Sequence, residues 1–239
     1  MNPQTLARLT GVFFLITYIT SIPPVFVFYA PVLKDPGYIT GPGPDTSVLV
    51  GAFLEVLLII ANIGSAVALF PIFKRQNEVL ALGFVGARII ESVFIAVGIL
   101  SLLAVVTLRQ EAVGADAASL TLIGQALVAI HDWTFLLGPG FVVGVGNGMI
   151  LGYFMYRSGL VPRPMALLGL IAGPLLCARG IALLFGVVDE GATLPTLAAT
   201  PEFFWELALG IYLTIKGFRP SAAASERART TTKELVVAA

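Results

Sequence analysis

The residues best able to do chemistry in this chain are ionisable and amide side chains set within or at the ends of long apolar stretches. A charge at the centre of a lipid bilayer costs about 2.5–3.5 kcal/mol on insertion scales, so such residues face the protein interior and pair there. Arg88 and Glu91 lie three residues apart in one stretch, and therefore on one face of a helix. The remaining candidates for a ligand-binding site are Glu55, Asn62, His131, Asp132, Asn147, Arg179 and Glu206.

Two interpretations of these residues carry comparable weight. In the first, Arg88 and Arg179 form ion pairs with the glutamates and fix how the helices pack. In the second, the same side chains line a polar cavity in the outer half of a helix bundle. Such a cavity would bind or transport a small solute, a lipid headgroup or protons.

The third interpretation is an intramembrane enzyme in which Glu55, His131, Asp132 and Glu206 surround a metal ion. Catalytic zinc sites commonly use two or more histidines, and this chain has one. Neighbouring residues of a helix also point about 100° apart, so His131 and Asp132 are poorly placed to share a metal. The chain contains no GxSxG, HExxH, P-loop or dinucleotide-binding motif. We therefore expect no metal and no cofactor, and we favour a function other than catalysis.

The stretches that position these residues are typical of membrane spans. Hydrophobic residues make up 57% of the 239 residues and charged residues 12%, against about 25% charged in soluble domains. The net charge is zero, so nothing indicates a nucleic-acid partner, and the lipid bilayer is the expected surrounding. A bilayer core of about 30 Å needs about 20 helical residues. We predict an all-α polytopic membrane protein with six transmembrane helices, at residues 9–29, 48–72, 79–107, 133–156, 164–187 and 201–217.

The distribution of Lys and Arg predicts that both termini are cytoplasmic. Cytoplasmic loops are enriched in these residues, and six spans leave only Lys34 and Arg109 in the outer loops. The stretch 118–156 is too long for one crossing, but a second crossing would place Arg157 and Arg163 outside. Residues 119–130 are therefore expected to form an outer helix, either on the membrane or as an extension of the fourth span.

The domain organisation follows from these spans. Residues 1–219 are expected to form one transmembrane domain, and 220–239 a disordered cytoplasmic tail, because that segment is small, polar and charged. Thr200-Pro201-Glu202 is typical of a helix start, which would begin the sixth span. The single cysteine, Cys177, is expected to be a packing residue.

Four glycines in the fourth predicted span recur every four residues, at Gly140, Gly144, Gly148 and Gly152. This spacing places them on one face of a helix, where another backbone can approach closely. We predict that this face is a helix-packing seam, and such glycine faces could also join the chain to another copy or to a partner subunit. The alternative is that the glycines leave room for a ligand beside Asn147.

Three segments carry a resemblance to a known family: Ala87–Ser92, Ser158–Arg163 and Pro201–Phe218. In them the chain resembles small bacterial membrane proteins catalogued as domain of unknown function 4386. The resemblance extends over about residues 5–219. It implies a six-span protein of the bacterial cytoplasmic membrane, and it implies no activity, because the family has none assigned. The leading hypothesis is therefore binding or transport through the outer cavity, with an intramembrane metal enzyme or an accessory subunit as alternatives.

Overall fold

The computed structural model describes residues 2–111, 114–189 and 191–220, and every regular element among them is helical. Residues 221–239 lie outside this part, so the predicted disordered tail is not described. In chain order the elements are α1 (Pro3–Pro23), η1 (Pro24–Phe28), α2 (Ala30–Lys34), η2 (Tyr38–Thr40), α3 (Asp45–Phe73), α4 (Glu78–Glu111), α5 (Ala117–Leu137), η3 (Gly138–Val142), η4 (Gly144–Leu151), α6 (Gly152–Ser158), α7 (Arg163–Leu184) and α8 (Thr193–Ile215).

Five helical runs are long and apolar enough to cross a membrane, as expected for a membrane protein. They are Pro3–Phe28, Asp45–Phe73, Glu78–Glu111, Ala117–Ser158 and Arg163–Leu184. The sixth predicted span corresponds to α8, which is not among the five. Its 23 residues are long enough, at about 35 Å, but Glu202 and Glu206 lower its hydropathy.

The predicted helix start at Thr200-Pro201-Glu202 is wrong. These residues lie inside α8, which begins two turns earlier at Thr193. The Thr200 hydroxyl donates to the carbonyl of Thr196 (2.8 Å) within the helix instead of capping it. Proline is tolerated inside membrane helices because neighbouring groups satisfy the carbonyl that it leaves free.

The stretch that is too long for one crossing forms a single helical run from Ala117 to Ser158. Its glycine-rich middle, η3 and η4, winds as π-helix, in which each N–H bonds the carbonyl five residues before it. The 42 residues would measure about 60 Å, roughly twice a bilayer core. Residues 119–130 are part of α5 and continue this run.

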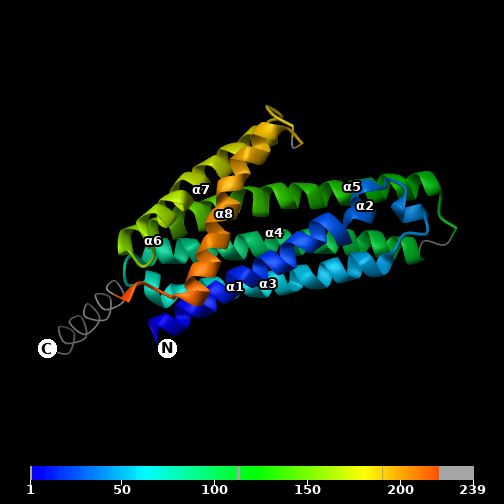
Figure 1. Ribbon diagram of the computed structural model, residues 1–239. Helices are drawn as coiled ribbons and strands as arrows, with labels where there is room; N and C mark the ends of the chain where they lie inside the picture. The colour runs from blue at the N-terminus through cyan, green and yellow to red at the C-terminus, as the bar shows by residue number, and fades with distance from the viewer. Residues whose placement is uncertain (1, 112–113, 190, 221–239) are drawn as a thin grey trace.

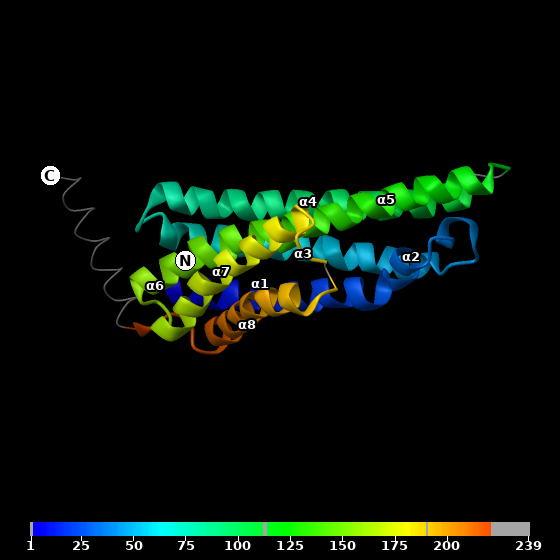
Figure 2. The same cartoon turned by 90° about the horizontal axis from the view of Figure 1, so that it is seen from above.

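The four long helical runs that begin with α1, α3, α4 and α5 lie side by side, while α7 and α8 form a hairpin that diverges from them (Figures 1 and 2). The Gln4 side chain joins the start of α1 to the end of α8. Its Nε2 donates to the Phe218 carbonyl (2.7 Å), and its Oε1 accepts from the Phe218 N–H (2.9 Å). We call this end of the bundle the terminal end, and the end that carries α2 and η2 the distal end.

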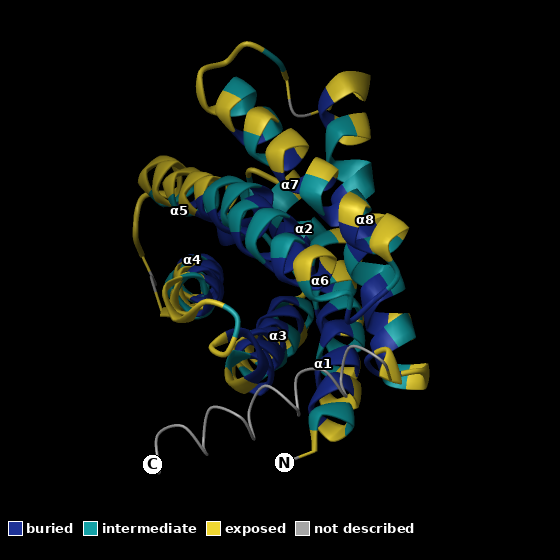
Figure 3. Ribbon diagram, turned by 90° about the vertical axis from the view of Figure 1, so that its left-hand side faces the viewer, coloured by how far each residue is buried: buried dark blue, intermediate teal, exposed yellow. Residues whose placement is uncertain are grey.

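Two clusters of buried apolar residues hold the bundle together. The terminal core includes Phe14, Leu69, Phe73, Phe154, Trp205 and Leu213, with the Phe73 and Phe154 rings stacked 4.2 Å apart. The distal core comprises Tyr29, Val32, Tyr38, Ile39, Val48, Leu102, Val105 and Val106. Buried faces turn inward and exposed faces outward around the whole bundle (Figure 3). Many exposed side chains are apolar, such as Ile60 and Leu100, as expected where lipid is the solvent.

The predicted glycine seam lies between η4–α6 and α7. A Cβ added at Gly148 would overlap the backbone of Gly173, and one at Gly144 would press on the Gly173 carbonyl and on Cys177. Gly152 lies against the α7 backbone near Gly169. Gly140 differs, because its nearest neighbours are the Phe135 carbonyl of its own helical run and the Arg179 guanidinium. The close approach of these helices brings α8, which packs on α7, towards the long helices.

Candidate functional site

A cavity of about 610 Å³ lies between the long helices and the α7–α8 hairpin. Most of its wall is apolar, formed by side chains such as Ile22, Leu58, Ile95 and Leu176. Seven of the nine predicted ligand-binding residues line it: Glu55, Asn62, Arg88, Glu91, His131, Arg179 and Glu206. The structure thus brings together side chains from five helices that the sequence places far apart.

The other two predicted residues lie next to the cavity. Asn147, on η4, is fully buried, and its side-chain amide donates to the Glu206 carboxylate. Its backbone carbonyl accepts from Nε1 of Trp205 (3.0 Å), which fixes η4 against α8. Asp132 is 62% exposed and lines a separate cavity of about 160 Å³ nearer the distal end. Its Oδ1 lies 3.4 Å from Nδ1 of His131.

Arg88, Glu91 and Asn62 form a closed ring of hydrogen bonds, and all three are buried. Arg88 Nη1 lies 2.8 Å from Glu91 Oε2, and Nη2 donates to Asn62 Oδ1 (2.5 Å). Asn62 Nδ2 completes the ring by donating to Glu91 Oε1 (2.9 Å). The Arg88 guanidinium also lies over the Phe14 ring, 5.6 Å from its centroid. The charges of Arg88 and Glu91 therefore neutralise each other inside the protein.

Glu55 has a neutral partner. The Tyr29 hydroxyl donates to Glu55 Oε2 (2.8 Å), and both residues are buried. The Tyr29 ring meets the His131 ring edge-to-face, with centroids 5.7 Å apart. This arrangement holds His131 at the cavity wall on the side where Glu55 lies.

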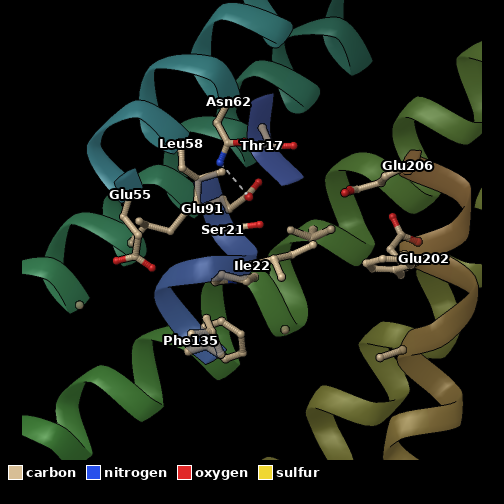
Figure 4. Close-up of a pocket in the computed structure, with 18 of the residues that line it drawn as sticks. Thr17, Ser21, Ile22, Glu55, Leu58, Asn62, Glu91, Phe135, Glu202 and Glu206 are labelled. Atoms are coloured by element: carbon tan, nitrogen blue, oxygen red, sulfur yellow. Dashed lines mark hydrogen bonds between the residues drawn. The ribbon is translucent and has the colours of Figure 1, made fainter. Parts of the chain in front are cut away.

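Glu202 is a cavity residue that the sequence analysis missed. It lines the cavity one helical turn from Glu206 and is 3% exposed. Neither of its carboxylate oxygens has a hydrogen-bond partner among the described residues. Figure 4 shows Glu202 and Glu206 together on α8, across the cavity from Glu55 and Asn62. The spacing of four between two glutamates in an apolar stretch could have identified the pair, but Glu202 was assigned to a helix start.

The cavity carries more negative than positive groups. Its described lining residues include four carboxylates (Glu55, Glu91, Glu202 and Glu206) and two guanidinium groups (Arg88 and Arg179). With Arg88 bound to Glu91, three carboxylates remain for one guanidinium. Burying ionised groups without compensating charge is costly, so this arrangement is complementary to a cation or to protons.

The predicted metal-ligand set is not assembled. Among the residues that the structure describes, no three His, Cys, Asp or Glu side chains converge as metal ligands would. Glu55 and Glu206 lie on opposite walls of the cavity (Figure 4), and Asp132 lines a different cavity. The half-buried thiol of Cys177 lies 3.7 Å from the Phe141 carbonyl, in a packing position.

Residues 9–217 match the family model described as Domain of unknown function (DUF4386). The chain belongs to this family. The match confirms the resemblance found in the three sequence segments. No curated protein and no solved structure matches the chain.

The ring formed by Arg88, Glu91 and Asn62 predicts a large effect on stability. Replacing Glu91 with Leu leaves the Arg88 guanidinium buried without its carboxylate, which should lower the free energy of unfolding by about 3–5 kcal/mol. Replacing Arg88 with Met and Asn62 with Leu as well should restore much of this loss, because apolar side chains can substitute for a buried ion pair and its hydrogen-bonded amide. Unfolding in detergent micelles, followed by circular dichroism, measures both variants.

The exposed pair of Lys74 and Glu78 provides the control for this experiment. Its side chains are more than half exposed, and exposed ion pairs contribute at most about 1 kcal/mol. Glu78→Gln should therefore unfold almost as wild type does. A Glu91→Leu variant as stable as Glu78→Gln would contradict the structural role of the ring.

Proposed function

We propose that this DUF4386 protein is a six-span protein of the bacterial cytoplasmic membrane that binds a small organic cation in the cavity beside α8. The observation that carries the proposal is Glu202, a residue of the cavity wall that is almost fully buried and whose carboxylate has no hydrogen-bond partner among the described residues. A buried carboxylate without a partner is unstable unless something neutralises it. A cation bound between Glu202 and Glu206 would do so.

The size and walls of the cavity define the kind of cation. A volume of about 610 Å³ is within the range of small-molecule sites, which is roughly 300–1,000 Å³. Apolar side chains such as Leu58, Ile95 and Val143 suit an apolar body, and the rings of Phe135 and Phe203 suit a positive charge. The best-fitting ligand is an organic cation that carries its charge on an apolar framework.

Protons are the second candidate ligand. When a bound cation leaves, a proton can neutralise the same carboxylate, because two ionised glutamates one turn apart repel each other out of water. Glu202 and Glu206 would then exchange a cation for protons. This exchange would link binding to the proton gradient across the membrane and would support transport.

The proposal of six spans depends on α8 crossing the membrane. Its length suffices for a crossing, and the hydrogen bonds between Gln4 and Phe218 place its end beside the start of α1, as an even number of crossings requires. The helix ends and turns at that end carry Lys74, Arg75, Arg157 and Arg163. The enrichment of cytoplasmic loops in Lys and Arg supports the terminal end as the cytoplasmic side.

The accessory-subunit hypothesis has less support. Gly144, Gly148 and Gly152 already contact α7 within the same chain, so these positions are occupied. Assembly with another copy or with a partner subunit would therefore use other surfaces. It stays a prediction.

Binding of tetraphenylphosphonium tests the proposed function, with tetraphenylborate as an anion of the same shape. In lipid nanodiscs, corrected for empty discs, the phosphonium should bind saturably and the borate should not. Glu202→Gln and Glu206→Gln should each weaken phosphonium binding about tenfold or more, since each removes a compensating charge. Glu78→Gln, which changes an exposed glutamate far from the cavity, is the matched control. Equal binding of both ions, or unchanged binding to Glu202→Gln, would refute the proposal.

Cysteine labelling tests the topology in a Cys177→Ala background, where the chain has no other cysteine. Thr40→Cys, in the exposed loop at the distal end, should react with a membrane-impermeant maleimide added outside intact cells. Arg75→Cys, between α3 and α4, should react only after the membrane is opened. The reverse pattern would overturn the orientation, and labelling of Arg219→Cys from outside would show that α8 does not return the chain to the cytoplasm.

A further inference from the structure

The cavity reaches the protein surface along one side, between the end of α1 and the first half of α8. Phe26 on η1 and Phe203 on α8 both line the cavity, yet they are 73% and 44% exposed. Ile22 and Ala199 lie beside them on the same two edges and also line it. A side chain that faces both the cavity and the outside of the protein marks a place where the cavity opens to its surroundings. We call these four residues the lateral opening.

The lateral opening begins where the contact between α1 and α8 ends. The two helices approach most closely near the terminal end, where a Cβ on Gly210 would meet Phe14 and Leu15. Nearer the opening, the Tyr18 hydroxyl donates to the Phe203 carbonyl (2.5 Å), and the two rings meet edge-to-face at 5.1 Å. Beyond this point Pro23 and Pro24 turn the chain into the π-helical η1, while α8 follows α7 away from the long helices (Figure 1). The divergence of these segments leaves the side of the cavity uncovered.

Buried apolar residues pack together at both ends of the bundle. On the terminal side, the cavity ends at the buried rings of Phe14, Phe84 and Trp205 in the terminal core. On the distal side, it ends at Tyr29, Val48 and the rest of the distal core.

The loop above the distal core is also fixed. Arg109 pairs with Asp45, and the Tyr38 hydroxyl donates to the same carboxylate (3.0 Å). Burial raises the pKa of Tyr38 to about 12, so it stays a neutral donor at physiological pH. These packed ends contrast with the lateral opening, where Phe26 and Phe203 are exposed.

The lateral opening lies at the depth of the lipid chains. Ala199 and Phe203 are 16 and 12 residues from Ile215, about 24 and 18 Å from the terminal end of α8. The tilt of α8 reduces both depths, so the two residues stay within a bilayer core of about 30 Å. All four residues of the opening have apolar side chains, as a lipid-facing edge requires.

We propose that the cation reaches Glu202 and Glu206 from the lipid bilayer through the lateral opening, not from water. This inference rests on the proposed function and narrows its substrate class. The ligand is an amphiphilic cation that first partitions into the outer half of the membrane. Hydrophilic cations do not partition into lipid, so they cannot reach the site by this route. The charge of the site alone would not exclude them.

A series of alkyltriphenylphosphonium cations distinguishes the lipid route from a water route. Methyl, butyl and hexyl members differ mainly in how strongly they partition into lipid. Binding to the protein in nanodiscs is followed by surface plasmon resonance, with empty discs as reference. With access from lipid, the association rate per aqueous concentration should rise roughly fourfold for each added methylene, in proportion to partitioning. An association rate that does not change along the series would overturn the lipid route.

A substitution in the opening tests the position of the route. Ala199→Trp places a large side chain between α8 and η1 and should slow association and dissociation of the butyl cation at least tenfold. Its matched control is Leu197→Trp, two residues away on the exposed, opposite side of α8, which should leave both rates unchanged. Equal rates for the two variants would place the route elsewhere. If Ala199→Trp does not fold, the alkyl series on wild type still decides between lipid and water.

The outcomes separate this inference from the proposed function. No saturable binding by wild type, or binding unaffected by Glu202→Gln, would refute the cation site itself. Binding that needs Glu202 but ignores both alkyl length and the Ala199 substitution would keep the site and refute only the lateral route.

Discussion

Charged groups inside a bilayer are stable only when other protein groups or a ligand compensate them, and this constraint explains the arrangement around the cavity. Glu91 and Asn62 compensate the charge of Arg88, and the hydrogen bonds among the three side chains form a closed ring. Glu55 accepts a hydrogen bond from the Tyr29 hydroxyl, and Glu206 accepts one from the Asn147 side-chain amide. Glu202 has no such partner among the described residues, so the protein alone does not compensate its charge. The cavity beside it supplies room for a ligand that would.

The contacts of η4 with α7 and α8 determine where the uncompensated charge of Glu202 lies. Gly148 and Gly173 allow η4 and α7 to touch through their backbones, and Trp205 fixes α8 to η4 through the Asn147 carbonyl. The α7–α8 hairpin is therefore close to the long helices at the terminal end and separates from them towards the distal end (Figure 1). The same geometry forms the cavity, places Glu202 and Glu206 on its wall and leaves exposed lining residues between η1 and α8.

Sequence reasoning reached the family, the helical membrane class and seven of the residues that line the cavity. Glu55, Arg88 and Arg179 line the cavity, as a sequence argument can anticipate, because ionisable residues in apolar stretches must face the interior whatever the details of packing. Sequence reasoning failed for Glu202, since Thr200 and Pro201 form a pattern typical of a helix start and α8 instead continues through it. Proline inside a membrane helix makes such patterns ambiguous.

Other features depend on contacts that a single sequence does not specify. The residue number of Arg88 gives its depth in the membrane but not the rotation of its helix, so its partners were not predictable. The π-helical winding of η3 and η4 was also missed, because the glycines there indicated only a packing face of a regular helix. The divergence of α7 and α8, and with it the lateral opening, arises from several helix contacts acting together.

The central claim is that the carboxylates on α8 form a site for a cation. Its most direct test is a crystal structure of the protein with tetraphenylarsonium, whose arsenic atom can be located by anomalous scattering. The account predicts an anomalous peak inside the cavity, beside the carboxylates of Glu202 and Glu206, which is lost when both are changed to Gln. Arsenic bound only at the outer surface, with the cavity filled by ordered water or lipid and Glu202 hydrogen-bonded within the protein, would contradict it.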